Sequence, residues 1–179
     1  ISSHNIIDSL QSNATSPFCG WYWEILEMEM KTSTRTAIVT GGASGIGKAI
    51  VARLAHDGIA VAVADKDEKQ AAEVASNIQN GSQIISVGVD VSDWKSVENM
   101  IKVSHERLGS LDILICNAGI MDRAPFMEME ENFWDNVLNI NLGGVFRCSQ
   151  VAARYMIAGS RGGRIVNVAS NSGIFGGRG

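Results

Sequence analysis

Apolar side chains follow two patterns that alternate along the chain. Five short segments are apolar nearly throughout, without alternating polar positions, which is typical of strands buried on both faces of a sheet. They are residues 36–40, 59–64, 83–89, 111–116 and 164–169. We therefore expect five parallel strands in a sheet that is covered on both faces.

Helical spacing fills the stretches between these segments. One inward face is predicted from positions three and four apart, namely Ile46, Ala49, Ile50, Arg53 and Leu54. A second follows the same spacing through Val97, Met100, Ile101, Ser104 and Leu108, and helix ends are expected at Gly58, Gly81 and Gly109. Alternation of strand and helix with short links requires right-handed crossovers. The predicted fold class is α/β, a doubly wound parallel sheet between two layers of helices.

Residues 1–33 differ from the rest of the chain. They begin with Ile, have no Lys or Arg before Lys31, and lack a continuous apolar core, so they resemble neither a signal peptide nor a membrane span. We expect a disordered leader there, followed by one domain over residues 34–179. That domain is expected to be incomplete at its carboxyl end.

Composition narrows the classes of function. The chain has 179 residues, of which 45% are hydrophobic, and a formal net charge of −4. Because no basic surface or run of like charges is indicated, we expect a small-molecule substrate and neither nucleic acid nor membrane as a partner. Cys19, Cys116 and Cys148 are odd in number and lack CxxC spacing, so neither a disulfide framework nor a metal site is predicted. A cytoplasmic location fits best.

The strongest motif follows the first predicted strand and opens a helix. It reads Thr40-Gly41-Gly42-Ala43-Ser44-Gly45-Ile46-Gly47. In that context Gly41 would allow a sharp turn, Gly45 would let the backbone approach a pyrophosphate, and Gly47 would let the helix pack closely. The helix N-terminus would present free N–H groups to the phosphates, and Ser44 could add a hydroxyl donor. The alternative is a glycine-rich turn that binds nothing.

The spacing Thr-Gly-x-x-x-Gly-x-Gly resembles the short-chain dehydrogenase/reductase family, over residues 34–179. The resemblance implies a Rossmann fold that binds NAD(P) through Gly41, Ser44, Gly45, Ile46 and Gly47. Asp65 ends the second strand about twenty residues after the loop, where a carboxylate can accept hydrogen bonds from the adenosine ribose and repel a 2′-phosphate. NAD is therefore favoured over NADP, although Lys66 next to Asp65 argues the other way. Asp65 could instead be a solvated turn residue.

Two further strand ends resemble the family. Asp90-Val91 is similar to its Asp-hydrophobe pair, which contacts the adenine, although Asp90, Ser92 or Asp93 could equally cap the next helix. Cys116-Asn117-Ala118-Gly119 resembles its Asn-Asn-Ala-Gly, which braces the sheet and lies along the cofactor. Cys116 replaces the first Asn there. As a small, buried thiol without a neighbouring His, it is a poor candidate nucleophile.

Asn141 matches the family's helix Asn, whose backbone carbonyl holds a water in the proton relay. Gly143-Gly144 would cost the helix about 1 kcal/mol each, which indicates close packing or a bend. The resemblance also implies a homodimer or homotetramer for the complete protein. For Phe133, Trp134 and Phe146 we expect packing in the core or between subunits.

Ser170 follows the fifth strand and aligns with the family's active-site Ser, which hydrogen-bonds the substrate oxygen; Ser172 fits less well. From the pattern alone, Ser170 could equally be a turn residue. The family's Tyr-x-x-x-Lys does not occur, since Tyr22 and Tyr155 are the only tyrosines and neither is followed by Lys four residues later. We expect that motif beyond residue 179.

Two functions from different classes follow. The first is an oxidoreductase that transfers a hydride between NAD(H) and a secondary alcohol or ketone, similar to a 3-oxoacyl reductase or a polyol dehydrogenase, with no turnover from these 179 residues. The second is a non-catalytic short form that binds a dinucleotide or a partner. A methyltransferase on a similar sheet fits poorly because the glycine spacing is wrong for it.

Overall fold

The computed structural model describes residues 35–78, 81–121 and 124–171. All its elements lie in the compact unit Arg35–Gly179, so the predicted leader over residues 1–33 falls outside the described residues. In chain order the elements are β1 (Thr36–Thr40), α3 (Gly45–His56), β2 (Ala60–Asp65), α4 (Glu68–Asn77), β3 (Ile84–Gly88), α5 (Trp94–Leu108), β4 (Ile113–Cys116), η1 (Phe126–Glu128), α6 (Glu131–Leu138), η2 (Asn139–Gly143), α7 (Gly144–Gly159) and β5 (Arg164–Asn167).

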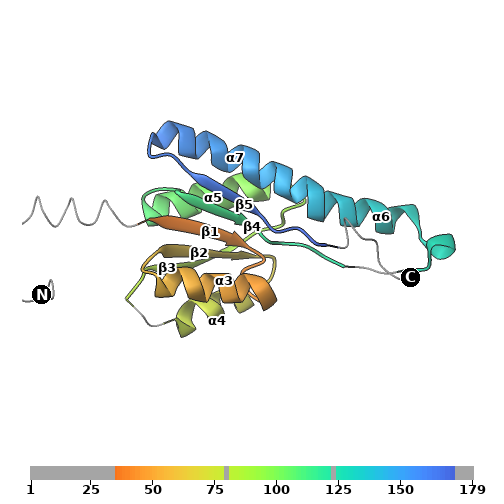
Figure 1. Cartoon of the computed structure of the whole chain (residues 1–179), viewed down its shortest axis with the longest axis horizontal. Coiled ribbons are helices and arrows are strands. Elements are labelled where there is room, and N and C mark those ends of the chain that lie inside the picture. Colours follow the sequence, from red (N-terminus) through yellow and green to blue (C-terminus); the bar gives the residue numbers. More distant parts are fainter. Residues whose placement is uncertain (1–34, 79–80, 122–123, 172–179) are drawn as a thin grey trace, which may run out of the picture. The chain divides into compact units, whose positions relative to one another are not determined.

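The five strands form one parallel sheet in the order β3-β2-β1-β4-β5 (Figure 1). Helices α3 and α4 cover one face, and α5 and α7 cover the other. The chain leaves β1 toward β2 and later returns to the opposite side of β1 with β4. This reversal places a switch point between β1 and β4, outside whose carboxyl ends ligands bind in such sheets. The predicted doubly wound α/β fold is confirmed.

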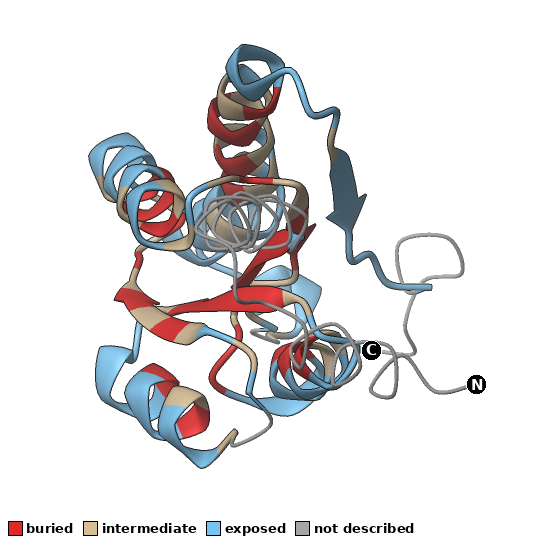
Figure 2. Ribbon diagram, turned by 90° about the vertical axis from the view of Figure 1, so that its left-hand side faces the viewer, coloured by how far each residue is buried: buried red, intermediate tan, exposed pale blue. Residues whose placement is uncertain are grey.

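Burial differs between the centre and the edges of the sheet (Figure 2). Every residue of β1 is buried, as are the first five of β2, as predicted. The prediction was wrong for the two edge strands. β3 alternates between buried and half-buried positions, and all four residues of β5 are exposed. The reason is positional, because among the described elements β5 pairs only with β4.

Helix α3 buries a different face from the one predicted. Its buried residues are Gly47, Val51 and Ala55, whereas Ile46 is 67% exposed. The close approach of Gly47 to the loop that contains Gly41 sets the rotation of the helix about its axis. Ile50 and Leu54 are therefore only half-buried, at the margin of the inward face.

Helix α5 agrees with its predicted face, since Val97, Met100, Ile101 and Ser104 are all buried. Its N-cap is Asp93, whose carboxylate accepts a hydrogen bond from the backbone N–H of Ser96 at 2.8 Å. Its C-cap is Gly109 in the left-handed conformation, with φ 85°. Asp90 is therefore not the helix cap.

One helical rod runs from α6 into α7 through η2, a π-helical turn (Figure 1). Close packing, one of the two explanations of the glycine pair, is confirmed here, whereas the bend stays a prediction. The helix changes its hydrogen-bond pattern at this point, and a Cβ on Gly144 would lie 2.8 Å from Cγ2 of Val91. None of the helices in the described part of the chain is long and apolar enough to cross a membrane.

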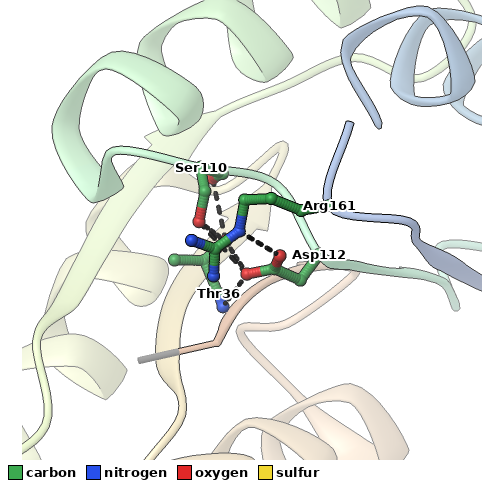
Figure 3. A network of polar contacts seen from close by, with 4 residues as sticks. All are labelled: Thr36, Ser110, Asp112 and Arg161. Atoms are coloured by element: carbon green, nitrogen blue, oxygen red, sulfur yellow. Dashed lines mark hydrogen bonds and ion pairs between the residues drawn. The ribbon is translucent and has the colours of Figure 1, made fainter. Parts of the chain in front are cut away.

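A polar network ties together the amino ends of β1, β4 and β5 (Figure 3). One oxygen of Asp112 accepts hydrogen bonds from the backbone N–H of Thr36 (2.9 Å) and from the Ser110 hydroxyl (3.1 Å). Its other oxygen pairs with Nε of Arg161 at 3.1 Å. Burial raises the pKa of Asp112, but the hydrogen bonds outweigh it, and the pKa lies below its ordinary value. The network therefore fixes the end of the sheet opposite to the switch point.

Candidate functional site

A cavity of about 370 Å³ opens at the carboxyl ends of the strands, beside the switch point. Its walls come from the loops after β1, β2, β3 and β4 and from η2. They are formed by Gly41, Ser44, Gly45, Ile46, Asp65, Lys66, Val89, Asp90, Val91, Asn117, Ala118, Gly119, Ile120 and Ile140. All predicted site residues except Gly47, Asn141 and Ser170 line it.

The glycine loop has the conformations that a phosphate-binding turn needs. Gly41 has φ 64°, which only glycine adopts readily, and a Cβ on it would lie 2.9 Å from Cα of Ala118. Gly45 has φ 49°, and a Cβ there would meet nothing within 4 Å. Gly47 lies behind the cavity wall, and a methyl group on it would overlap the carbonyl oxygen of Gly41.

Helix α3 points its N-terminus into the cavity. Ser44 is the N-cap, and its side chain makes no capping hydrogen bond. The first N–H groups of a helix have no partner within it, and they carry the positive end of the helix dipole. Together with the open side of Gly45, these groups form a cradle that fits a pyrophosphate.

Thr40 is the hub that holds this loop against the loop after β4. Its hydroxyl oxygen accepts hydrogen bonds from the backbone N–H groups of Asn117 (3.0 Å) and Ala118 (3.1 Å), and it donates to the carbonyl of Ile115 (3.3 Å). The amide nitrogen of Asn117 donates in return to the carbonyls of Thr40 and Gly41, at 3.1 and 3.2 Å. The Cys116-Asn117-Ala118-Gly119 segment thus braces the central sheet.

Asp65 faces the glycine loop as well as the cavity. One carboxylate oxygen accepts a hydrogen bond from the backbone N–H of Ala43 at 3.0 Å, and the other accepts one from the backbone N–H of Asp67 at 3.1 Å. The interpretation as a solvated turn residue is therefore incomplete, because the side chain orients the loop. A carboxylate oxygen can accept more than one hydrogen bond, so these contacts leave room for a ribose hydroxyl.

Asp90 and Lys66 form an ion pair on one side of the cavity, with Nζ and Oδ2 2.9 Å apart. The other oxygen of Asp90 accepts hydrogen bonds from the hydroxyl and the backbone N–H of Ser92. The pKa of Asp90 is lowered to about 2, with the largest effect from the Ser92 hydroxyl and the next largest from Lys66. The pair neutralises Lys66 next to Asp65.

Asp90 should make stability depend on pH in the acid range. Because its pKa is lowered on folding, its contribution is complete above the ordinary value of 3.8 and is lost as the pH falls toward about 2. Urea unfolding between pH 5 and pH 2 should therefore show the wild type losing its advantage over Asp90→Asn as the pH falls. An advantage independent of pH would contradict the assignment.

Asn141 lies behind the cavity wall, in the π turn. Its side-chain oxygen accepts a hydrogen bond from the N–H of Ile120 at 2.9 Å, and its amide nitrogen donates to the carbonyl of the same residue at 2.8 Å. The side chain thus pairs with the backbone as a neighbouring strand would. The side chain holds Ile120 in the wall. The predicted role of the Asn141 backbone carbonyl, which is to hold a water of the proton relay, stays a prediction.

Ser170 is exposed and is not among the residues that line the cavity. It follows β5, where Asn167 is the register partner of Cys116, so the chain after β5 starts beside the segment that carries Asn117. Ser172 lies outside the described residues. The predicted role of Ser170 stays a prediction.

Several residues that shape the site were not predicted from the sequence. Val89, Ile120 and Ile140 line the cavity, and each directly neighbours a predicted residue in the sequence. Thr40 opens the glycine motif, and as a Thr at the end of a central strand it holds a hydroxyl where two loops meet. The signals for these residues are local in the sequence.

Cys148 is a partner that no local signal indicates. It is buried on α7, and it hydrogen-bonds the thiol of Cys116, which also lies 3.8 Å from the Ser149 hydroxyl. The hydrogen bond with Cys116 and burial raise the pKa of Cys148 above its ordinary value. Cys116, the last residue of β4, accordingly packs in the core against α7, as expected for a buried thiol.

Comparison with known proteins agrees with this geometry. The family model described as short chain dehydrogenase matches residues 35–179. The chain is 40% identical over 147 residues to 3beta-hydroxysteroid dehydrogenase 2 of Eggerthella lenta, covering 81% of this chain and 56% of that protein. It is 38% identical over 144 residues to a sorbitol dehydrogenase of Cereibacter sphaeroides, covering 80% and 56%.

A solved structure is similar in fold as well as in sequence. It is a putative short-chain alcohol dehydrogenase from Sinorhizobium meliloti 1021, with a TM-score of 0.75, 37% identity, and coverage of 79% of this chain and 56% of that one. The chain thus spans little more than half the length of the relatives it matches. Since the family model matches the whole unit that contains the sheet and the cavity, the chain belongs to the short-chain dehydrogenase family.

Proposed function

We propose that the whole protein is an oxidoreductase that transfers a hydride between NAD(H) and a secondary alcohol or ketone. The observation that carries the proposal is the cavity in which the N-terminus of α3 and the open side of Gly45 face the carboxylate of Asp65. The relatives are named as a 3beta-hydroxysteroid dehydrogenase and a sorbitol dehydrogenase, and both compounds carry secondary hydroxyl groups. A substrate of this class is part of the proposal.

The residues of the cavity would divide the work of holding the dinucleotide. The N–H groups at the start of α3 and the Ser44 hydroxyl would bind the pyrophosphate, and Asp65 would bind the adenosine ribose. Val91 would contact the adenine, and Ala118 and Gly119 would lie along the rest of the molecule. When bound, the dinucleotide supplies the hydride chemistry.

For catalysis we propose that Ser170 holds the substrate oxygen and that the backbone carbonyl of Asn141 takes part in a proton relay. The acid that completes this site would be the Tyr of a Tyr-x-x-x-Lys motif, which does not occur within these 179 residues. A form that binds dinucleotide without turnover is the second candidate. Assays on secondary alcohols separate the two candidates.

The preference for NAD is testable at Asp65. The wild type should bind NADH more tightly than NADPH, because the carboxylate repels a 2′-phosphate, and Asp65→Asn should reduce that preference about tenfold, equal to about 1.4 kcal/mol. Asn retains one oxygen for the N–H of Ala43, so the loop should keep its conformation. Fluorescence titration with both dinucleotides measures the ratio. An unchanged ratio would refute the role, and binding of neither dinucleotide by the wild type would refute the proposed function.

We further propose a cytoplasmic homodimer or homotetramer. The predicted aromatic residues are not in the core, since Phe133, Trp134 and Phe146 are 40%, 57% and 57% exposed. Leu138 and Leu142 are exposed apolar residues of the same α6–α7 rod, and exposed apolar surface of this kind supports association with a second copy of the chain.

A further inference from the structure

Arg147, on α7, contacts Val91 in the cavity wall and Asn139, the neighbour of the wall residue Ile140. Its Nη1 donates to the carbonyl of Val91 at 3.2 Å and to the carbonyl of Asn139 at 3.0 Å, and its Nη2 donates to the side-chain oxygen of Asn139. Val91 belongs to the loop after β3, and Asn139 begins the π turn η2. We propose that Arg147 is a positioning residue for dinucleotide binding, an inference that rests on the proposed function.

The backbone is shaped to accommodate this side chain. A Cβ on Gly143 would lie 2.8 Å from Nη1 of Arg147, so any larger residue would push the guanidinium away. A Cβ on Gly144 would lie 2.8 Å from Val91, so the second glycine lets the helix approach the loop that Arg147 binds. Both glycines therefore leave room at one junction, the place where Arg147 joins the loop after β3 to η2. This role accounts for the helix stability that two glycines cost within a helical rod.

The charge of Arg147 is directed at these loops. In the described ranges Arg147 forms no ion pair with a carboxylate, and its guanidinium donates hydrogen bonds to Val91 and Asn139. Hydrogen bonds from a charged donor are stronger than neutral ones. Nη1 bridges the two carbonyls, and Nη2 of the same planar fork holds the Asn139 side chain, whereas the single ammonium of a lysine is a point donor that lacks this second, fixed contact.

The junction reaches the cavity from both sides. Val91 lines the cavity itself, and Ile140, which also lines it, directly follows Asn139. Asn141, the next residue of the π turn, fixes the backbone of Ile120, a third wall residue. Arg147 thus sets the distance between the wall after β3 and the wall formed by η2, where the adenine side of a dinucleotide would lie.

Arg147→Met tests this role because it retains a long side chain and removes the donors. Arg154→Met is the matched control, since Arg154 lies on the same helix and its Nη2 donates to the side-chain oxygen of Gln150 four residues away. Amide hydrogen exchange without ligand should become faster at residues 91–92 and 139–143 in Arg147→Met alone. Affinity for ADP and for NADH, measured by calorimetry and fluorescence, should fall about tenfold in that variant.

Arg147→Lys should recover less than half of the lost affinity on a logarithmic scale, because the fork is absent. Unchanged local exchange in Arg147→Met, or full recovery by lysine, would overturn the positioning role while leaving the proposed function intact. Uniformly faster exchange over the whole sheet would also overturn it, because the residue would then be a general stabiliser. Failure of the wild-type chain to bind ADP and NADH would overturn the proposed function and this role together.

Discussion

Gly47→Ala is expected to abolish dinucleotide binding and to lower the free energy of unfolding by about 3 kcal/mol. The added methyl would overlap the carbonyl oxygen of Gly41 and would lie 2.6 Å from the amide nitrogen of Asn117. Neither atom can yield easily, because Gly41 is in a tight turn with φ 64° and Asn117 is hydrogen-bonded to Thr40. Helix α3 must therefore move away from the loop, which takes its N-terminus out of the cavity.

The same substitution at Gly159 is the control. Gly159 ends α7, and a Cβ there would meet nothing within 4 Å, so Gly159→Ala should stabilise the protein by about 0.5–1 kcal/mol through helix propensity alone. Urea unfolding of both variants and titration with NADH measure the two effects. If Gly47→Ala were as stable as the wild type and bound NADH, close packing of α3 on the loop would not be what the site requires.

The centre of the fold could be predicted because its signals are local. β1 and β2 are buried on both faces, and a continuous apolar run reports this environment directly. β5 also carries adjacent β-branched apolar residues, yet Ile165 and Val166 are 37% and 48% exposed. The residues of a strand show which side chains could be buried. Whether they are buried depends on the neighbouring strands in the sheet, and these come from distant parts of the sequence.

The rotation of α3 shows a second limit. Side chains at spacings of three and four fitted a face through Ile46 and Ile50, but the buried face is one residue further along. A helix with many small residues has no single apolar face, so one close contact, at Gly47, fixes its orientation. α5 carries large apolar residues at Val97, Met100 and Ile101, and for it the spacing was sufficient.

The residues of the candidate site likewise fall into those that local patterns predict and those that only the tertiary structure shows. The glycine loop and the residues that end the strands could be found, because a parallel sheet brings the carboxyl ends of its strands to one edge. Arg147 could not, since it reaches Val91 across 56 positions of the sequence and its spacing matches no motif. The residues that face a ligand are marked by local patterns, whereas those that hold the walls apart depend on tertiary structure.

Thr40→Val is expected to destabilise the protein by about 3 kcal/mol, although it preserves the shape of the side chain. Thr40 is 1% exposed, and its hydroxyl oxygen is the acceptor for the N–H groups of Asn117 and Ala118. A valine would leave these two part-buried donors without that acceptor, and a buried, unpaired donor costs about 1–3 kcal/mol. The loop after β4 should also loosen, which weakens NADH binding.

Thr40→Ser separates the hydroxyl from the methyl group. It retains the acceptor and removes one buried methyl, so it should cost only about 1 kcal/mol and should leave affinity for NADH close to that of the wild type. Urea unfolding monitored by circular dichroism gives the two free energies, and titration gives the two affinities. If the hydroxyl of Thr40 holds the two loops, valine should lower the free energy of unfolding more than serine does, even though valine is the better apolar match for a buried position. If serine were as damaging as valine, the methyl packing of Thr40 would hold the two loops together, and its hydrogen bonds would not.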